Sequence, residues 1–96
     1  MLYFDWSPEK NEWLKAERDV CFEDVQLAFE GGRVLAVYAH PNQRRYPGQQ
    51  MLVVEIRRYG YLVPFVQDSE KIFLKTIIPN RVATEKYIIK RKQRII

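Results

Sequence analysis

The spacing of apolar residues changes near residue 33, dividing the chain into a helical part and a part made of short strands. Residues 2–5 read as a short strand or lead-in. Residues 8–18 then show a helical pattern, with Ser7 as N-terminal cap and a proline at the first helical position, where its missing N–H costs nothing. We expect Trp13 and Leu14 to face the interior.

A second helix is predicted over residues 22–30. Its apolar positions fall at helical spacing: Phe22, Val25, Ala28 and Phe29. Gly31 and Gly32 end the helix, because glycine readily adopts the left-handed backbone of a C-terminal cap. Asp24 stands where a capping box requires an acid, whereas Cys21, at the cap position itself, accepts hydrogen bonds only weakly.

Four short segments rich in β-branched and aromatic residues follow, separated by turns. They are residues 33–39, 50–56, 61–66 and 71–78. The tight turns at 57–60 and 67–70 favour an antiparallel meander of about four strands. Pro64 lies within the third strand and indicates an edge or a bulge there. In the fourth strand, alternation places Phe73, Lys75 and Ile77 on one face.

The chain ends in a third predicted helix, which Asn80 can cap and which runs from residue 81 to about residue 92. Two helices, an antiparallel sheet and a final helix make an α+β fold. The length of 96 residues fits one domain spanning residues 1–96.

Composition narrows the class of protein. Hydrophobic residues make up 47% and charged residues 29%, an ordinary balance for a folded domain. We see no secretory signal and no run of about 20 apolar residues, and we therefore expect a cytoplasmic protein without a membrane segment. A single cysteine and a single histidine make a disulfide or a Cys/His metal site implausible.

Charge is distributed unevenly along the chain. Residues 1–32 carry eight acids and three bases, a net charge of −5, whereas residues 33–96 carry thirteen bases and four acids, a net charge of +9. Such a chain suits a polyanionic ligand on one side. The alternative is a solvated surface that binds nothing.

Basic residues concentrate at the C-terminal end. Lys86, Lys90 and Arg94 share one face of the predicted helix and could bind phosphates, unless this end is simply a solvated tail. Arg81 stands at the start of that helix, where a cation opposes the helix dipole, and a bound anion would explain its presence. Lys75 either extends over an open sheet face or contributes to a binding surface.

The long polar loop over residues 40–50 is a second candidate region. His40, Arg44, Arg45 and Tyr46 combine planar groups that stack on unpaired bases with groups that can transfer protons. The alternative is a surface loop in which the histidine merely ends a strand.

The sequence contains no glycine-rich phosphate loop and none of the common hydrolase or metal-binding motifs. Any reaction would therefore proceed without a metal or cofactor. Transesterification of RNA meets this condition, because the protein need only align the 2′-hydroxyl, move two protons and stabilise the phosphorane.

Both ends of the chain resemble BrnT-type toxins. The start, FDWSPEK at residues 4–10 and VCFEDV at residues 20–25, is similar to the family's aromatic strand, its Trp-Asp-x-x-Lys helix start and its Val-Ser-Phe-Glu segment. The close, residues 76–87 (TIIPNRVATEKY), is similar to its Ile-Ser-x-Arg-x-Ala-Thr-x-x-Glu signature.

This resemblance implies a RelE/ParE-like fold and an mRNA-cleaving toxin that a ribbon-helix-helix-type antitoxin neutralises. It also implies that Arg81 binds the phosphate or stabilises the transition state, that Lys10 is a basic residue on the first helix, and that Glu85 is a partner on the last helix. Leu14, Glu17 and Arg18 stand where many BrnT toxins carry Asn, Lys and His.

Two functional hypotheses follow. In the first, the protein is a cofactor-free endoribonuclease. Arg81 and Lys75 would hold the scissile phosphate, and His40 or Tyr46 would transfer protons. The RNA backbone would be bound by Arg44 and Arg45, with Lys10, Lys86 and Lys90.

In the second hypothesis, the protein inhibits growth without catalysis, by binding a nucleic acid or protein target as ParE-like relatives do, or as a decayed toxin. Under either hypothesis we expect the antitoxin to cover the positive surface.

Overall fold

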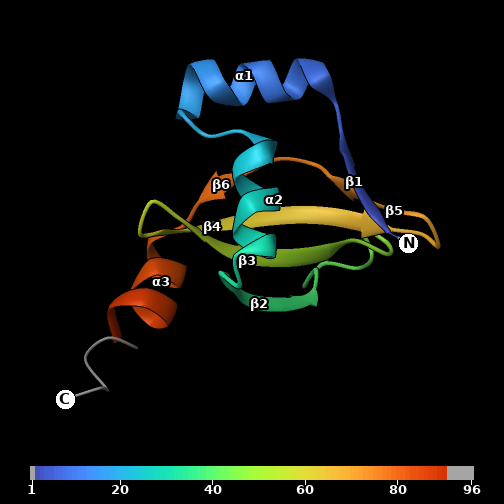
Figure 1. Cartoon of the computed structure of the whole chain (residues 1–96). Coiled ribbons are helices and arrows are strands. Elements are labelled where there is room, and N and C mark those ends of the chain that lie inside the picture. The colour runs from blue at the N-terminus through green and yellow to red at the C-terminus, as the bar shows by residue number, and fades with distance from the viewer. Residues whose placement is uncertain (1, 91–96) are drawn as a thin grey trace.

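The computed structural model, which describes residues 2–90, has a six-stranded sheet at its centre (Figure 1). The strands are β1 (Tyr3–Trp6), β2 (Val34–Ala39), β3 (Gln50–Ile56), β4 (Tyr59–Gln67), β5 (Lys71–Leu74) and β6 (Ile78–Pro79). The helices are α1 (Pro8–Arg18), α2 (Phe22–Glu30) and α3 (Arg81–Ala83), and α3 continues directly as a π-helix, η1 (Thr84–Ile89). The predicted α+β class is confirmed.

The sheet is mixed, so the expectation of an antiparallel sheet of about four strands is wrong. Its order is β1-β5-β4-β3-β2, with β6 also pairing with β4. The meander from β2 to β5 is antiparallel as predicted, but β1 runs parallel to β5, with Tyr3 opposite Lys71 and Trp6 opposite Leu74. α1, α2 and the strands β2 to β4 lie between β1 and β5 in sequence, and this gives the chain enough length for a parallel crossover.

The last predicted strand is interrupted. β5 ends at Leu74, residues 75–77 leave the sheet, and pairing resumes in β6. Lys75 is therefore exposed and outside any strand. The Lys75 N–H donates to the Pro64 carbonyl (2.8 Å). Pro64 has no N–H with which to bind the neighbouring strand in return, and the edge of β4 where this donor is missing faces the break. Pro64 therefore lies in an internal strand, not at the predicted edge or bulge, and the interruption is in the neighbouring strand, between β5 and β6.

The core lies between the two N-terminal helices and one face of the sheet. Its fully buried members include Leu14, Phe22, Val25, Val54, Val63, Leu74 and Ile77. Ile77 thus packs on the helical side, contrary to the predicted alternation, because the chain has already left the strand. Trp13 (41% exposed) and Phe29 (47% exposed) also depart from the expected inward orientation. Trp13 lies between Lys10 and Arg18, and Phe29 packs edge-on against Phe4.

Side chains cap both N-terminal helices. The Ser7 hydroxyl accepts the Lys10 N–H, as predicted. In α2, Asp24 accepts the Cys21 N–H (3.0 Å), while the buried Asn11 of α1 accepts the Phe22 N–H (2.7 Å). An asparagine of one helix therefore caps the next and fixes the angle between them.

The β3–β4 turn contains two residues, Arg57 (φ 50°) and Arg58 (φ 68°), both with left-handed backbone. Such a turn normally takes Asn-Gly, because side chains with a Cβ are strained there. The Arg57 guanidinium donates to the Asp19 carbonyl and lies 3.7 Å from the Asp24 carboxylate. This arginine therefore ties the hairpin to the connection between the two N-terminal helices.

The last helix docks against the beginning of β4. Asn80 caps it as predicted, its Oδ1 accepting the Ala83 N–H (2.7 Å). Only three residues are α-helical before the π-helix, and residues 91 and 92 of the predicted helix lie outside the described residues. Within residues 2–90, no helix has the length and apolar character needed to cross a membrane.

Candidate nucleic-acid interface

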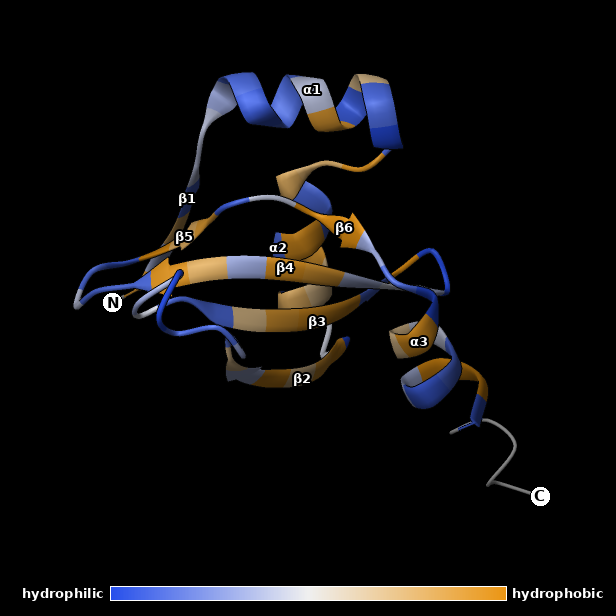
Figure 2. Cartoon of the chain, turned by 180° about the vertical axis from the view of Figure 1, so that it is seen from behind, coloured by the Kyte–Doolittle hydropathy of each residue, from blue (hydrophilic) through white to orange (hydrophobic). Residues whose placement is uncertain are grey.

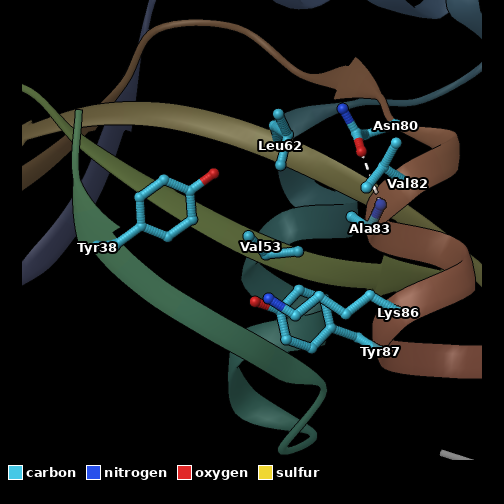
Figure 3. Close-up of a pocket in the computed structure, with 8 residues that line it drawn as sticks. All are labelled: Tyr38, Val53, Leu62, Asn80, Val82, Ala83, Lys86 and Tyr87. Atoms are coloured by element: carbon cyan, nitrogen blue, oxygen red, sulfur yellow. Dashed lines mark hydrogen bonds between the residues drawn. The ribbon is translucent and has the colours of Figure 1, made fainter. Parts of the chain in front are cut away.

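The face of the sheet away from α1 and α2, which we call the open face, is seen in Figure 2, which shows the chain from behind. A groove of about 400 Å³ lies between this face and the last helix (Figure 3). Its lining residues are Tyr38, Val53, Leu62, Asn80, Val82, Ala83, Lys86 and Tyr87. Val53 and Leu62 lie directly opposite each other on β3 and β4 and form an apolar floor. The polar and aromatic lining residues stand around this floor and form the walls of the groove.

The walls carry one ammonium group and two phenols. Lys86 and Tyr87 extend from the helix toward the sheet, and the Lys86 Nζ lies 5.2 Å from the centre of the Tyr87 ring (Figure 3). Tyr38, 42% exposed, faces the groove from β2. An ammonium group can pair with a phosphate, aromatic faces can stack on bases, and phenols can donate hydrogen bonds to phosphate oxygens.

Arg81 and Glu85 belong to the same helix as this groove. Arg81 stands between two lining residues, Asn80 and Val82, and its side chain is 85% exposed. Its Nε lies 3.4 Å from the Glu85 carboxylate, one helical turn away. An exposed ion pair of this kind is weak, so an incoming phosphate can replace the carboxylate.

Four of the residues expected to act on RNA therefore share one short helix. They are Arg81, Glu85, Lys86 and Lys90. Arg94, the third member of the predicted basic face, lies outside the described residues.

The β2–β3 loop forms a second cluster. The His40 and Tyr46 rings lie 4.5 Å apart, and the Arg45 guanidinium lies over the Tyr46 ring at 5.5 Å. His40 Nδ1 accepts the Asn42 N–H (3.0 Å), which leaves Nε2 as the nitrogen that carries the proton in the neutral ring. Gln43 donates to the carbonyls at both ends of the loop, at 2.8 and 2.9 Å. The loop thus holds itself together, with Arg44 also exposed on it.

These two clusters lie at opposite ends of the sheet (Figure 1). The loop enters β3 at Gln50, which pairs with Phe65, whereas the last helix begins beside Gly60. Phe65 lies five positions along β4 from Gly60, or about 17 Å. The structure therefore does not bring His40 and Tyr46 together with Arg81 in one reaction centre.

Two further candidates lie apart from both clusters. Lys75 is at the β5–β6 break, with its Nζ 5.4 Å from the Phe73 ring. Lys10 is on α1, on the helical side of the sheet, with its Nζ 4.0 Å from the Trp13 ring. Neither lines the groove.

Sequence reasoning missed Tyr38 and Tyr87. The signal for Tyr87 is its position four residues after Ala83, which places both on one side of the helix. Alternation along β2 separates Tyr38 from Val37 and indicates the open face for the tyrosine. Neither signal could show that the two rings line the same groove, because that depends on where the last helix docks.

Other reactive groups do not form a competing site in the described part of the chain. Burial raises the pKa of the Cys21 thiol, so the thiol remains protonated and is a poor nucleophile at neutral pH. Within residues 2–90, no three His, Cys, Asp or Glu side chains lie close enough together to hold a metal ion.

Comparison with known proteins gives no match to this chain among protein-family models, curated proteins or solved structures.

Proposed function

We propose that this protein is the toxin of a type II toxin–antitoxin module and that it cleaves mRNA in the cytoplasm without a metal or cofactor. The observation that carries the proposal is the groove beside the last helix, where Lys86, Tyr87 and Tyr38 line one hollow and Arg81 stands next to it. The resemblance of both chain ends to BrnT-type toxins supports the same function.

In the proposed reaction, the RNA 2′-oxygen attacks the adjacent phosphorus and loses its proton. A 2′-O–P bond forms, the P–O5′ bond breaks, and the 5′-oxygen leaves and takes up a proton from solvent water. Arg81 and Lys86 would stabilise the charge that develops on the phosphate, and Tyr87 would donate a hydrogen bond to it. Glu85 would accept the 2′-hydroxyl proton once the phosphate has replaced it at Arg81, with which it forms an ion pair in the free protein.

His40 and Tyr46 have a different role in this proposal, because they lie at the far end of the sheet. With Arg44 and Arg45 they would hold RNA that extends beyond the groove, by stacking on bases and by contacts to the backbone.

The test is cleavage of a defined mRNA fragment by purified protein in the presence of a chelator. We expect fragments that end in a 2′,3′-cyclic phosphate and a 5′-hydroxyl. Arg81→Ala should slow single-turnover cleavage by roughly 10²–10³-fold, the loss typical of removing one charge-stabilising group. Lys15→Ala, which removes an exposed lysine of α1, is the matched control and should cleave at the wild-type rate. Equal cleavage by Arg81→Ala and wild type would remove Arg81 from the mechanism.

A second candidate function is binding of a nucleic-acid or protein target without cleavage. One observation favours it: the loop that carries His40 and the helix that carries Arg81 lie at opposite ends of the sheet (Figure 1). Intact RNA, together with binding that weakens steeply as salt increases, would support this function over cleavage.

A further inference from the structure

β2 is an unprotected edge of the sheet. It is the terminal strand in the strand order, and its six residues, Val34–Ala39, include no charged residue and no proline. The opposite edge, β1, has four residues, and its Asp5 is paired with Lys71 (3.4 Å). Proteins usually protect long apolar edges with charges or prolines, because free edges recruit other strands. β2 lacks both, and its irregularity is a register shift near Val34.

The free edge presents regular hydrogen-bonding groups. The His40 N–H donates to the Gln49 carbonyl (2.9 Å), next to the Ala39–Gln50 pair. Since successive residues of an antiparallel strand alternate in direction, the N–H groups of Val37 and Ala39 face away from β3. An incoming strand can therefore pair with them while the β2–β3 ladder remains intact.

Apolar side chains flank this edge on both faces of the sheet. On the helical face, Val37 of β2 and Phe29 of α2 line a groove of about 240 Å³ that extends across the sheet to Phe4 on β1. Val37 is 53% exposed and Phe29 47% exposed, because the nine-residue α2 covers only part of the sheet. On the open face stands Tyr38. An added strand would direct alternate side chains toward these two surfaces.

Charge identifies the strand that fits. Arg33 immediately precedes β2, and Arg44 and Arg45 follow it in the loop; none of the three pairs with a carboxylate within residues 2–90. Glu30, the acid nearest to Arg33 in sequence, already accepts a hydrogen bond from Gln26 (3.5 Å). A second copy pairing antiparallel through β2 would bring Arg33 of one molecule toward Arg44 and Arg45 of the other, and these like charges repel. An acidic segment is attracted to both ends of the strand.

We propose that β2 accepts an extended, acidic segment of a partner protein as an additional strand of the sheet. This inference goes beyond the proposed function, because it uses backbone groups and requires no RNA chemistry.

The test uses a fluorescent, acetylated heptapeptide of alternating Glu and Val, with a Lys and Val peptide as its control. We expect the acidic peptide to bind and the basic peptide to fail. Hydrogen exchange should slow at the Val37 and Ala39 amides, whereas that of Tyr38, whose N–H already faces β3, should not change. Binding by both peptides alike, or slowed exchange elsewhere but not at these two amides, would overturn the proposal.

Variants at the edge give a second criterion. Val37→Pro removes one outward N–H and should weaken binding of the acidic peptide by about tenfold or more, while Val37→Thr, which keeps the N–H and the branched side chain, should bind within about twofold of wild type. If Val37→Pro fails to fold, Ala39→Pro, which removes the other outward N–H, takes its place in the binding measurement. Full binding by a folded proline variant, or a wild-type dimer that this substitution dissociates, would overturn the proposal. Arg81→Ala should bind the peptide normally, which separates this result from the outcome of the cleavage assay.

Discussion

Gly60 and Thr84 are in direct contact across the junction between β4 and the last helix. The Gly60 N–H donates to Thr84 Oγ1 (2.8 Å), and that hydroxyl donates in turn to the Asn80 carbonyl (2.8 Å). A Cβ on residue 60 would lie 3.0 Å from the Thr84 backbone nitrogen. This contact fixes how close the helix comes to the sheet, and therefore the width of the groove.

Gly60→Ala should displace the last helix. Two of the three nearest atoms, Thr84 N and Ala83 C, belong to the backbone, so rotating the Thr84 side chain does not make room for the Cβ. We expect a loss of about 1–3 kcal/mol in the free energy of unfolding, measured by urea denaturation. RNA cleavage should fall as well. Thr84→Ser keeps the hydroxyl and the space, and it should remain close to wild type. A Gly60→Ala protein with wild-type stability would show that the helix adjusts freely.

Asn11→Ala should destabilise the packing of α1 against α2. The substitution leaves the buried Phe22 N–H without its acceptor and removes the amide that donates to Glu23 (2.8 Å), which together should cost about 1–3 kcal/mol. Asn42→Ala removes a comparable acceptor, for the Arg45 N–H, in an exposed loop and should cost much less. Equal losses at the two sites would contradict the buried cap.

The contribution of Glu23 to stability should depend on pH. The hydrogen bond from Asn11 lowers the pKa of the Glu23 carboxyl below its usual value of 4.5, so the ionised form stabilises the folded state. This stabilisation is complete above the unfolded pKa and is lost as pH falls through the lower, folded pKa. The stability difference between wild type and Glu23→Gln should therefore be constant above about pH 5 and shrink in more acidic solution.

Glu17→Gln is the control for this measurement, since Glu17 is exposed and has no hydrogen-bond partner within residues 2–90. A wild-type curve that runs parallel to that of Glu23→Gln down to pH 3 would contradict the role of the Asn11–Glu23 hydrogen bond.

Arg58→Gly should stabilise the protein, whereas Arg57→Gly should not. Both residues have a left-handed backbone that costs a residue with a Cβ about 1 kcal/mol, and glycine removes that cost. Only Arg57 contacts the Asp19–Asp24 region, so its replacement also loses these contacts. We expect Arg58→Gly to raise the melting temperature by a few degrees. A decrease would indicate that the Arg58 side chain makes a stabilising contact.

Local sequence signals were sufficient for most elements of the fold. Ser7, Asn80 and the helical spacing of apolar residues identified the starts of three helices, and turn residues separated the strands of the meander. These features depend on neighbours within a few residues, and a sequence pattern records such neighbours directly.

Features that depend on distant contacts were not predictable in this way. The pairing of β1 with β5 joins residues nearly 70 positions apart, and the interruption after Leu74 reflects a proline on the neighbouring strand. The candidate site shows the same difference between features set by local sequence and features set by distant contacts. Arg81, Glu85, Lys86 and Lys90 lie on one helix, and local sequence is enough to indicate this, whereas the separation of His40 from Arg81 follows from strand register.

The parallel pairing of β1 with β5 has a consequence for the newly made chain. Tyr3–Trp6 has no strand to join until Leu74 has been synthesised, and Arg18 waits for the Ile77 carbonyl, which it contacts at 2.6 Å. Closing so long a loop is slow and entropically costly. The sheet therefore cannot close at β1, and α1 cannot make its contact with Ile77, until residues 71–77 have left the ribosome.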